Sequence, residues 1–345
     1  MKLTPAIAWV PAIALMAAAA WADDRILGLA VTELPQRSYD QAAQDVAKIG
    51  VRYATIPLQW DEIETSPGVY APDPDWLAIA TAYYPTLQWK VALEINPIDT
   101  VADRRPAWLR DVAWDDPKVI AAFEALLADA LAKSKGIELV SLAIGNEVDA
   151  LLGDDAKAWT AYETFLAKSI ATARNLRPGV LLGVKTTFVG LTGNLATHIK
   201  LLNGLTDVVM LTYYPIDEKF RARDPETAAA KDLTAMVEAF PGRRIHLAEV
   251  GYPSSATCAA GEKGQTRFVG QFFSAWDKHA ASINAVYWDW MTDISVEEVT
   301  AASRYYGVDQ KCFTEFIGTL GLETHDLKPK QAWQVFADEA ARRFQ

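Results

Sequence analysis

Short apolar runs alternate with amphipathic stretches along the chain from residue 26 onward. Several of these runs are continuously apolar, which is typical of parallel strands that are covered on both faces. Because each run is followed by a helix-compatible segment, the pattern predicts one α/β domain, a parallel (β/α)8 barrel or TIM barrel. The eight predicted strands are Ile26–Val31, Val51–Pro57, Lys90–Ile95, Glu138–Ile144, Val180–Thr186, Asp207–Tyr213, Arg244–Val250 and Ala285–Trp290.

The intervening segments carry recognisable helix starts and stops. Asp116-Pro117 opens one helical pattern, and Arg177-Pro178-Gly179 closes the next. An open doubly wound sheet is the alternative, but no GxGxxG motif follows the first strand and no P-loop is found. No low-complexity linker divides residues 23–345, so we predict that they form a single domain.

Residues 1–22 are typical of a signal peptide. Lys2 is followed by an Ala-rich apolar stretch, and Ala20-Trp21-Ala22 has the small-x-small form of a cleavage site. The alternative is a single membrane anchor. Pro5 and Pro11 interrupt the apolar stretch, which favours a cleaved leader. We therefore expect an exported protein, periplasmic or secreted, with no membrane segment after cleavage.

Acidic residues outnumber basic ones, since 44 Asp and Glu oppose 33 Lys and Arg for a formal net charge of −11. Such a surface repels phosphate backbones and anionic lipid, which argues against nucleic-acid and membrane-surface partners. The four histidines show no ligand spacing, so we predict neither a metal site nor a cofactor. Cys258 and Cys312 could form a disulfide or remain separate thiols.

Two glutamates follow apolar strands at the end where a parallel barrel places its active site. Glu147 comes just after the strand ending at Ile144, and Glu249 lies at the end of Arg244–Val250. A buried carboxylate is costly unless it is paired or used, and each could simply form a barrel-end salt bridge. Together they favour glycoside hydrolysis, which needs one protonated and one ionised carboxyl group.

The motifs around these glutamates resemble those of the clan A retaining glycoside hydrolases. Gly145-Asn146-Glu147 and Ala248-Glu249-Val250-Gly251-Tyr252-Pro253 carry the resemblance. It implies that Glu147 is the acid/base, that Glu249 is the nucleophile, and that β-linked polysaccharide or oligosaccharide is cleaved with retention through a glycosyl-enzyme intermediate. In motif the chain is most similar to plant-type β-1,3-glucanases and endo-β-1,4-galactanases.

The resemblance and the strand ends also suggest which residues bind a sugar. By resemblance, Tyr214 donates a hydrogen bond to the nucleophile and Trp288 lies under the sugar. Trp290 shares a face with Trp288 by strand alternation, and Asp289 should face away as a structural residue. The full predicted substrate-binding set is Asn146, Tyr214, Trp288, Trp60, Asn96 and Trp290.

The sequence is compatible with other interpretations. Asn96 could serve only the turn before Pro97. A carbohydrate-binding barrel without hydrolysis, or a transglycosylase, would carry the same motifs. The sequence does not distinguish endo from exo action, and we expect a monomer whose partner is its saccharide substrate.

Overall fold

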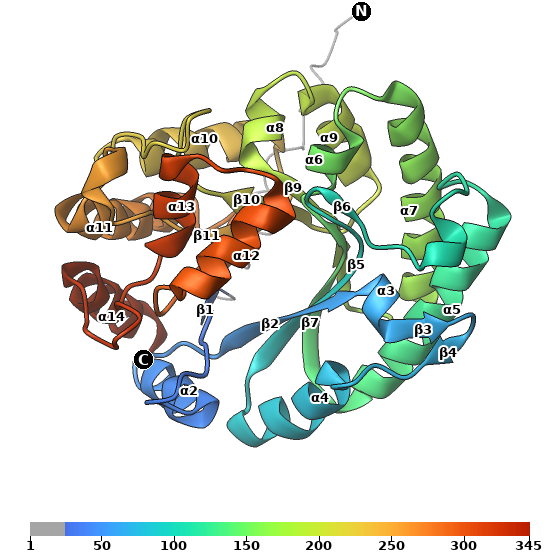
Figure 1. Ribbon diagram of the computed structural model, residues 1–345, viewed down its shortest axis with the longest axis horizontal. Coiled ribbons are helices and arrows are strands. Elements are labelled where there is room, and N and C mark those ends of the chain that lie inside the picture. Colours follow the sequence, from blue (N-terminus) through green and yellow to red (C-terminus); the bar gives the residue numbers. More distant parts are fainter. Residues whose placement is uncertain (1–24) are drawn as a thin grey trace, which may run out of the picture.

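Parallel strands form a closed ring surrounded by helices in the computed structural model, which describes residues 25–345 (Figure 1). The predicted signal peptide, residues 1–22, lies outside the described residues. In chain order the ring strands are β1 (Ile26–Leu29), β2 (Tyr53–Gln59), β5 (Lys90–Asp99), β7 (Glu138–Asn146), β8 (Leu181–Gly183) with β9 (Lys185–Thr187), β10 (Val209–Tyr213), β11 (Ile245–Val250) and β12 (Ile283–Trp288).

Two hydrogen-bonded paths make up the ring, and every pairing along them is parallel. One path runs β1-β12-β11-β10-β9 and the other β2-β5-β7-β8. The paths meet at the fifth strand, which is split between Gly183 and Lys185. They meet again where β1 lies against β2, because a Cβ on Gly28 would come within 2.7 Å of the Tyr53 carbonyl oxygen. The predicted (β/α)8 barrel is confirmed.

Helices cover the outside of the ring and close its loops. Asp116 and Asp155 cap the helices that follow them, since each carboxylate accepts hydrogen bonds from backbone amides of the first turn. Within residues 25–345 no helix has the length and apolarity needed to cross a membrane. The larger helices are α2 (Tyr39–Ala47), α4 (Trp76–Leu87), α5 (Pro117–Lys133), α7 (Ala156–Leu176), α9 (Ala196–Gly204), α10 (Ala228–Ala239), α11 (Glu262–Lys278), α12 (Val296–Tyr306), α13 (Lys311–Gly318) and α14 (Gln331–Phe344).

Shorter elements lie in the loops between these helices and strands. They are α3 (Trp60–Ile63), α6 (Val148–Leu152), α8 (Phe188–Thr192), β3 (Glu64–Ser66), β4 (Val69–Tyr70), β6 (Ala102–Asp103), η1 (Ala107–Leu109), η2 (Ser134–Gly136) and η3 (Ala256–Cys258). Cys258 and Cys312 are joined by a disulfide with a Cα–Cα distance of 5.5 Å, which settles the pairing that the sequence left open. The bond ties η3, after β11, to α13, after β12.

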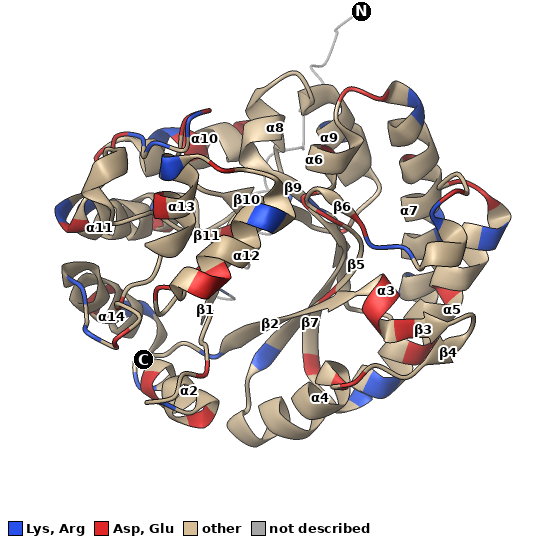
Figure 2. Ribbon diagram, in the orientation of Figure 1, with Lys and Arg blue, Asp and Glu red and all other residues tan. Residues whose placement is uncertain are grey.

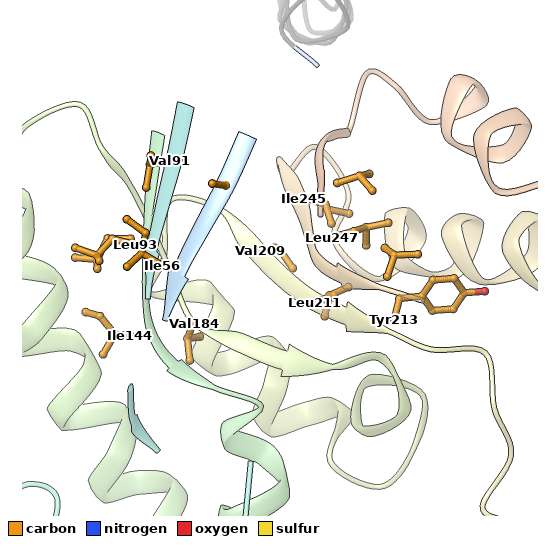
Figure 3. Packing of buried hydrophobic residues seen from close by; sticks show 14 of the residues in the cluster. Ile56, Val91, Leu93, Ile144, Val184, Val209, Leu211, Tyr213, Ile245 and Leu247 are labelled. Atoms are coloured by element: carbon orange, nitrogen blue, oxygen red, sulfur yellow. The ribbon is translucent and has the colours of Figure 1, made fainter. Parts of the chain in front are cut away.

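Strand alternation divides the buried side chains between an outer and an inner layer. Val91 and Leu93 of β5 belong to the main core between strands and helices, as do side chains of β2, β7, β10 and β11 (Figure 3). Ala92, between them, packs in a small cluster inside the ring. The next inward residues, Glu94 and Asn96, line a cavity instead. The same alternation that builds the core therefore aims polar side chains into the barrel mouth.

Candidate active site

A cavity of about 1080 Å³ opens at the carboxyl ends of the ring strands. Residues at or directly after the ends of all the ring strands line it. Its volume lies just above the range of about 300–1,000 Å³ that is usual for small-ligand sites. The barrel mouth is therefore the natural place to look for chemistry.

Glu147 reaches the cavity through a tight turn after β7. Gly145 has a φ of +91°, and an added Cβ there would come within 2.5 Å of the Tyr162 hydroxyl oxygen. Glu147 itself has a φ of 45°, in the left-handed region that non-glycine residues rarely adopt. Backbone strain of this kind is concentrated at functional sites in proteins.

Two threonine hydroxyls hold the Glu147 carboxyl group. Thr212 Oγ1 donates to Oε1 at 2.5 Å, and Thr100 Oγ1 donates to Oε2 at 2.9 Å. Burial and then the nearby Glu249 carboxylate raise the pKa of Glu147 to about 7, and the threonine hydrogen bonds oppose that shift. A carboxyl group with this pKa is available as a proton donor near neutral pH.

Glu249 is held at both oxygens by groups that donate hydrogen bonds. Lys185 Nζ lies 2.6 Å from Oε1, and the Tyr214 hydroxyl donates to Oε2 at 2.8 Å. The side chain keeps 19% of its surface exposed to the cavity. Glu249 therefore has a different environment from Glu147, whose partners are neutral hydroxyls.

Lys185 also bonds Glu94, so Glu94, Lys185 and Glu249 form a buried ion triad. The Lys185 ammonium lies 2.9 and 3.0 Å from the two oxygens of Glu94. Burial opposes the charge on Lys185, but the carboxylates of Glu249 and Glu94 outweigh it and raise the pKa of the lysine. Burial also raises the pKa of Glu94, and the Lys185 charge opposes that shift.

Asp289 brings a further carboxyl group to the cavity, where we predicted an outward-facing structural residue. Its side chain is 7% exposed and lies 3.0 Å from the Tyr214 hydroxyl. Burial and the Glu249 charge raise the pKa of Asp289 far above its usual range. The prediction was wrong: the alternation itself holds, but its inward positions are Tyr287 and Asp289, whereas we had assigned the inward position to Trp288.

The structure does not bring Trp60 or Trp288 to the cavity, so these two predictions were wrong. Trp60 is fully buried because it continues the core-facing positions Ile56 and Leu58, and its indole packs 4.9 Å from Phe123. Trp288 points outward from β12 and packs 5.5 Å from Phe336. Tyr287, one residue earlier, occupies the inward position.

The remaining predicted binding residues line the cavity: Asn96, Asn146, Tyr214 and Trp290. Asn96 is fully buried, and neither atom of its amide group has a hydrogen-bond partner within the chain. Asn146 Nδ2 donates to Asp99 Oδ1 at 2.8 Å, and its own Oδ1 has no such partner. Buried amides of this kind need partners, and sugar hydroxyls could supply them.

Sequence reasoning missed Glu94 and Lys185, although a signal was present. Both lie inside segments predicted as buried strands, and most strand positions are uncharged (Figure 2). A charge in such a strand requires a partner, and opposite charges on two strands of one barrel could have been paired. Among the described residues no group of three or more His, Cys, Asp or Glu side chains is arranged to hold a metal ion.

No protein-family model matches the sequence, and no curated protein matches it either. Solved structures do match the fold. An exo-beta-1,4-mannosidase from Opitutaceae bacterium strain TAV5 has a TM-score of 0.70 at 15% identity, with 93% of this chain and 60% of that chain covered. This protein therefore spans less than two thirds of the mannosidase.

In two further matches, a larger share of the matched chain is covered. A GH5_18 protein from Streptomyces cattleya in complex with GlcNAc has a TM-score of 0.70 at 17% identity, covering 93% of this chain and 80% of that chain. Xylanase 10B from Thermotoga maritima has a TM-score of 0.67 at 14% identity, covering 94% and 97%. At these identities the likeness shows a shared (β/α)8 barrel.

Proposed function

We propose that the protein is a retaining glycoside hydrolase that cleaves β-linked polysaccharide or oligosaccharide. One observation carries the proposal: Glu147 and Glu249 face the same barrel-mouth cavity in opposite electrostatic settings. Retaining glycosidases need such a pair, one carboxyl group as the acid and the other as the nucleophile. The solved structures with the same fold include a mannosidase and a xylanase.

Glu147 acts first as the acid. Its proton passes to the glycosidic oxygen while a Glu249 oxygen attacks the anomeric carbon, and the bond to the leaving sugar breaks. A water molecule then attacks the glycosyl-enzyme, Glu147 takes its proton, and Glu249 is released as a carboxylate. A Glu147 pKa of about 7 suits both the donating and the accepting step.

Lys185 and Tyr214 position the nucleophile. With a hydrogen bond on each oxygen, the Glu249 carboxylate is fixed in orientation before the substrate arrives. Such preorganisation lowers the cost of reaching the transition state. Asn96 and Asn146 offer unpartnered amide atoms to the sugar hydroxyls, and Trp290 offers an aromatic face.

The sugar and linkage are also part of the proposal. Motif resemblance suggests β-1,3-glucan and β-1,4-galactan, and the names of two structural neighbours, an exo-beta-1,4-mannosidase and an endo-beta-1,4-xylanase, add β-1,4-mannan and β-1,4-xylan. These four polymers, with the matching aryl β-glycosides, form the first screen. The proposal also includes export to the periplasm or medium, which rests on the leader predicted in residues 1–22. We propose that the enzyme acts there as a monomer.

Azide rescue of two alanine variants tests the catalytic roles. In Glu147→Ala an activated aryl glycoside still forms the intermediate, and azide needs no general base to resolve it, so a β-glycosyl azide is expected. In Glu249→Ala azide enters from the vacated face and gives the α-azide. Glu138→Ala, an exposed residue at the start of β7, is the matched control and should keep full activity.

The outcome distinguishes the proposal from its rivals. The same azide anomer from both variants, or full activity in both, would refute the assigned roles. Binding of the polymers without any cleavage would favour a carbohydrate-binding barrel. Transfer products with an added acceptor sugar, in place of free sugar, would identify a transglycosylase.

A further inference from the structure

A pair of helices after β12 lies over the barrel mouth. Residues 296–318, here named the strap, contain α12 and α13, and Figure 1 shows α12 crossing in front of the strand ring. No residue of α12 is fully buried. The helix therefore adds little to the barrel core, and its position needs another explanation.

One end of the strap is fastened beside Glu147. The Tyr305 hydroxyl donates to Asp99 Oδ2 at 2.6 Å and lies 3.0 Å from the Asp99 carbonyl oxygen. Asp99 Oδ1 in turn accepts from Asn146, the residue before Glu147. Thr100, next to Asp99, donates to Glu147 itself. This contact brings the loop after β12 to the opposite side of the ring.

The other end of the strap is fastened beside Glu249. Cys312 is bonded to Cys258 in the loop after β11. The Phe316 ring meets the Tyr214 ring edge-on at 5.4 Å, and Tyr214 donates to Glu249. The strap thus runs from the partners of one proposed catalytic carboxyl group to the partners of the other.

The underside of the strap forms part of the cavity wall. Tyr306, Val308, Phe313 and Phe316 all line the cavity. Burial, and then the charges of Glu147 and Glu249, raise the pKa of Tyr306. The cavity therefore continues beneath the strap.

We infer that the strap makes the enzyme act at chain ends, because an end must be threaded beneath residues 296–318 before a glycosidic bond can reach the carboxyl pair. The inference rests on the proposed glycosidase function. An uninterrupted polysaccharide segment could settle into an open groove, but it cannot enter a groove that is bridged above the bond to be cut. Internal bonds are therefore protected while both ends of the strap are fastened.

The test uses oligosaccharides of β-1,3-glucan, β-1,4-galactan, β-1,4-mannan and β-1,4-xylan that are labelled at the reducing end. From whichever series is cleaved, the wild type should release products from one terminus in successive steps of constant size. Oligosaccharides of that series blocked chemically at both ends should be cleaved at least tenfold more slowly. Early products cut at scattered internal bonds, or equal cleavage of the blocked substrates, would overturn the inference.

Tyr305→Phe removes the hydrogen bond to Asp99 that fastens this end of the strap, and Tyr305 itself does not line the cavity. We expect several-fold more internal cuts per terminal cut, measured as viscosity loss against reducing ends, with unchanged hydrolysis of the aryl glycoside. Tyr83→Phe is the matched control, since it removes a comparable bond from a tyrosine hydroxyl, to Asp40 at 3.0 Å, far from the mouth. An unchanged product pattern in Tyr305→Phe would count against the strap as the determinant.

Failure of the inference is distinguishable from failure of the proposed function. If aryl glycosides are hydrolysed and polymers are cut internally by the wild type, the glycosidase proposal stands and the strap inference falls. If no glycoside of any kind is hydrolysed, both fall. Thermal unfolding of each variant checks that Tyr305→Phe is folded before its products are compared.

Discussion

Replacing Lys185 with methionine probes the buried ion triad. Methionine has a similar length and no charge. The variant therefore keeps most of the packing and removes only the charge of a side chain that is 3% exposed. Glu94, which is 4% exposed, then loses the cation that lies 2.9 and 3.0 Å from its oxygens. We expect a large loss of stability from this single change.

The expected magnitude follows from the geometry. Two unit charges at the triad's spacing attract by about 6 kcal/mol at an effective dielectric constant of about 20. Because Glu94 can take up a proton in the variant, the net cost should be the roughly 3–5 kcal/mol that is usual for breaking a buried pair. At roughly 2 °C per kcal/mol for a chain of this size, Tm should fall by roughly 6–10 °C near neutral pH.

The loss should depend on pH in a defined direction. Burial raises the pKa of Glu94, and losing Lys185 removes the charge that opposes this shift. A carboxyl group whose pKa is raised on folding favours the folded state fully below its unfolded value of about 4.3, and this advantage disappears as the pH rises through the folded pKa. The deficit of Lys185→Met should therefore be small near pH 4 and grow toward neutral pH.

Thermal unfolding at pH 4.5 and 7.5 measures this deficit. The double variant Glu94→Gln with Lys185→Met should recover part of the Tm lost at pH 7.5, since Glu94 no longer leaves a buried carboxylate without its cation. Lys48→Met removes an exposed ion pair with Asp45 and should change stability by less than about 1 kcal/mol. Equal deficits at the two pH values, or no recovery in the double variant, would refute the electrostatic explanation.

Further predictions concern the acid and the disulfide. Activity should fall as pH rises through about 7, where Glu147 loses its proton, and a profile unaltered by Glu147→Gln would contradict its role as acid. The Thr212 hydrogen bond lowers the pKa of Glu147, so Thr212→Val should move this alkaline limit to higher pH while Thr212→Ser keeps it; a shift to lower pH would refute the assignment. Replacing Cys258 and Cys312 with serine removes a disulfide that closes a loop with a sequence separation of 54, which should lower the free energy of unfolding by about 4 kcal/mol through chain entropy. Denaturant unfolding measures this loss, and an unchanged midpoint would mean that the disulfide adds no stability.

The fold and the carboxyl pair could be read from the sequence because both depend on local patterns. Continuous apolar runs separated by capped helices specify a parallel barrel, and the topology of such a barrel gathers the ends of its strands at one mouth. Glu147 follows such a run and Glu249 lies at the end of another, so the sequence alone predicted that both face one cavity. The same argument led to Asn96, which lines that cavity.

The direction in which a side chain points at a strand end was less predictable. Trp288 and Asp289 were assigned to opposite faces by alternation, and the structure keeps them on opposite faces but places Asp289, with Tyr287, inward and Trp288 outward. Trp60 was assigned to the cavity, but it continues the core-facing positions of β2 and the indole joins the core. Alternation tells which residues share a face, but the packing of the whole sheet decides which of the two faces lies inward.

The sequence determined which chemical groups are available, and the tertiary structure decided which of them meet. Glu94, Lys185 and Glu249 come from three strands that are distant in the chain, and only closure of the barrel brings Lys185 between the two glutamates. The strap needs contacts of the same kind, from Tyr305 to Asp99. Short-range patterns fix strands and helices because backbone geometry repeats locally. A contact between distant segments depends on the packing of the whole chain.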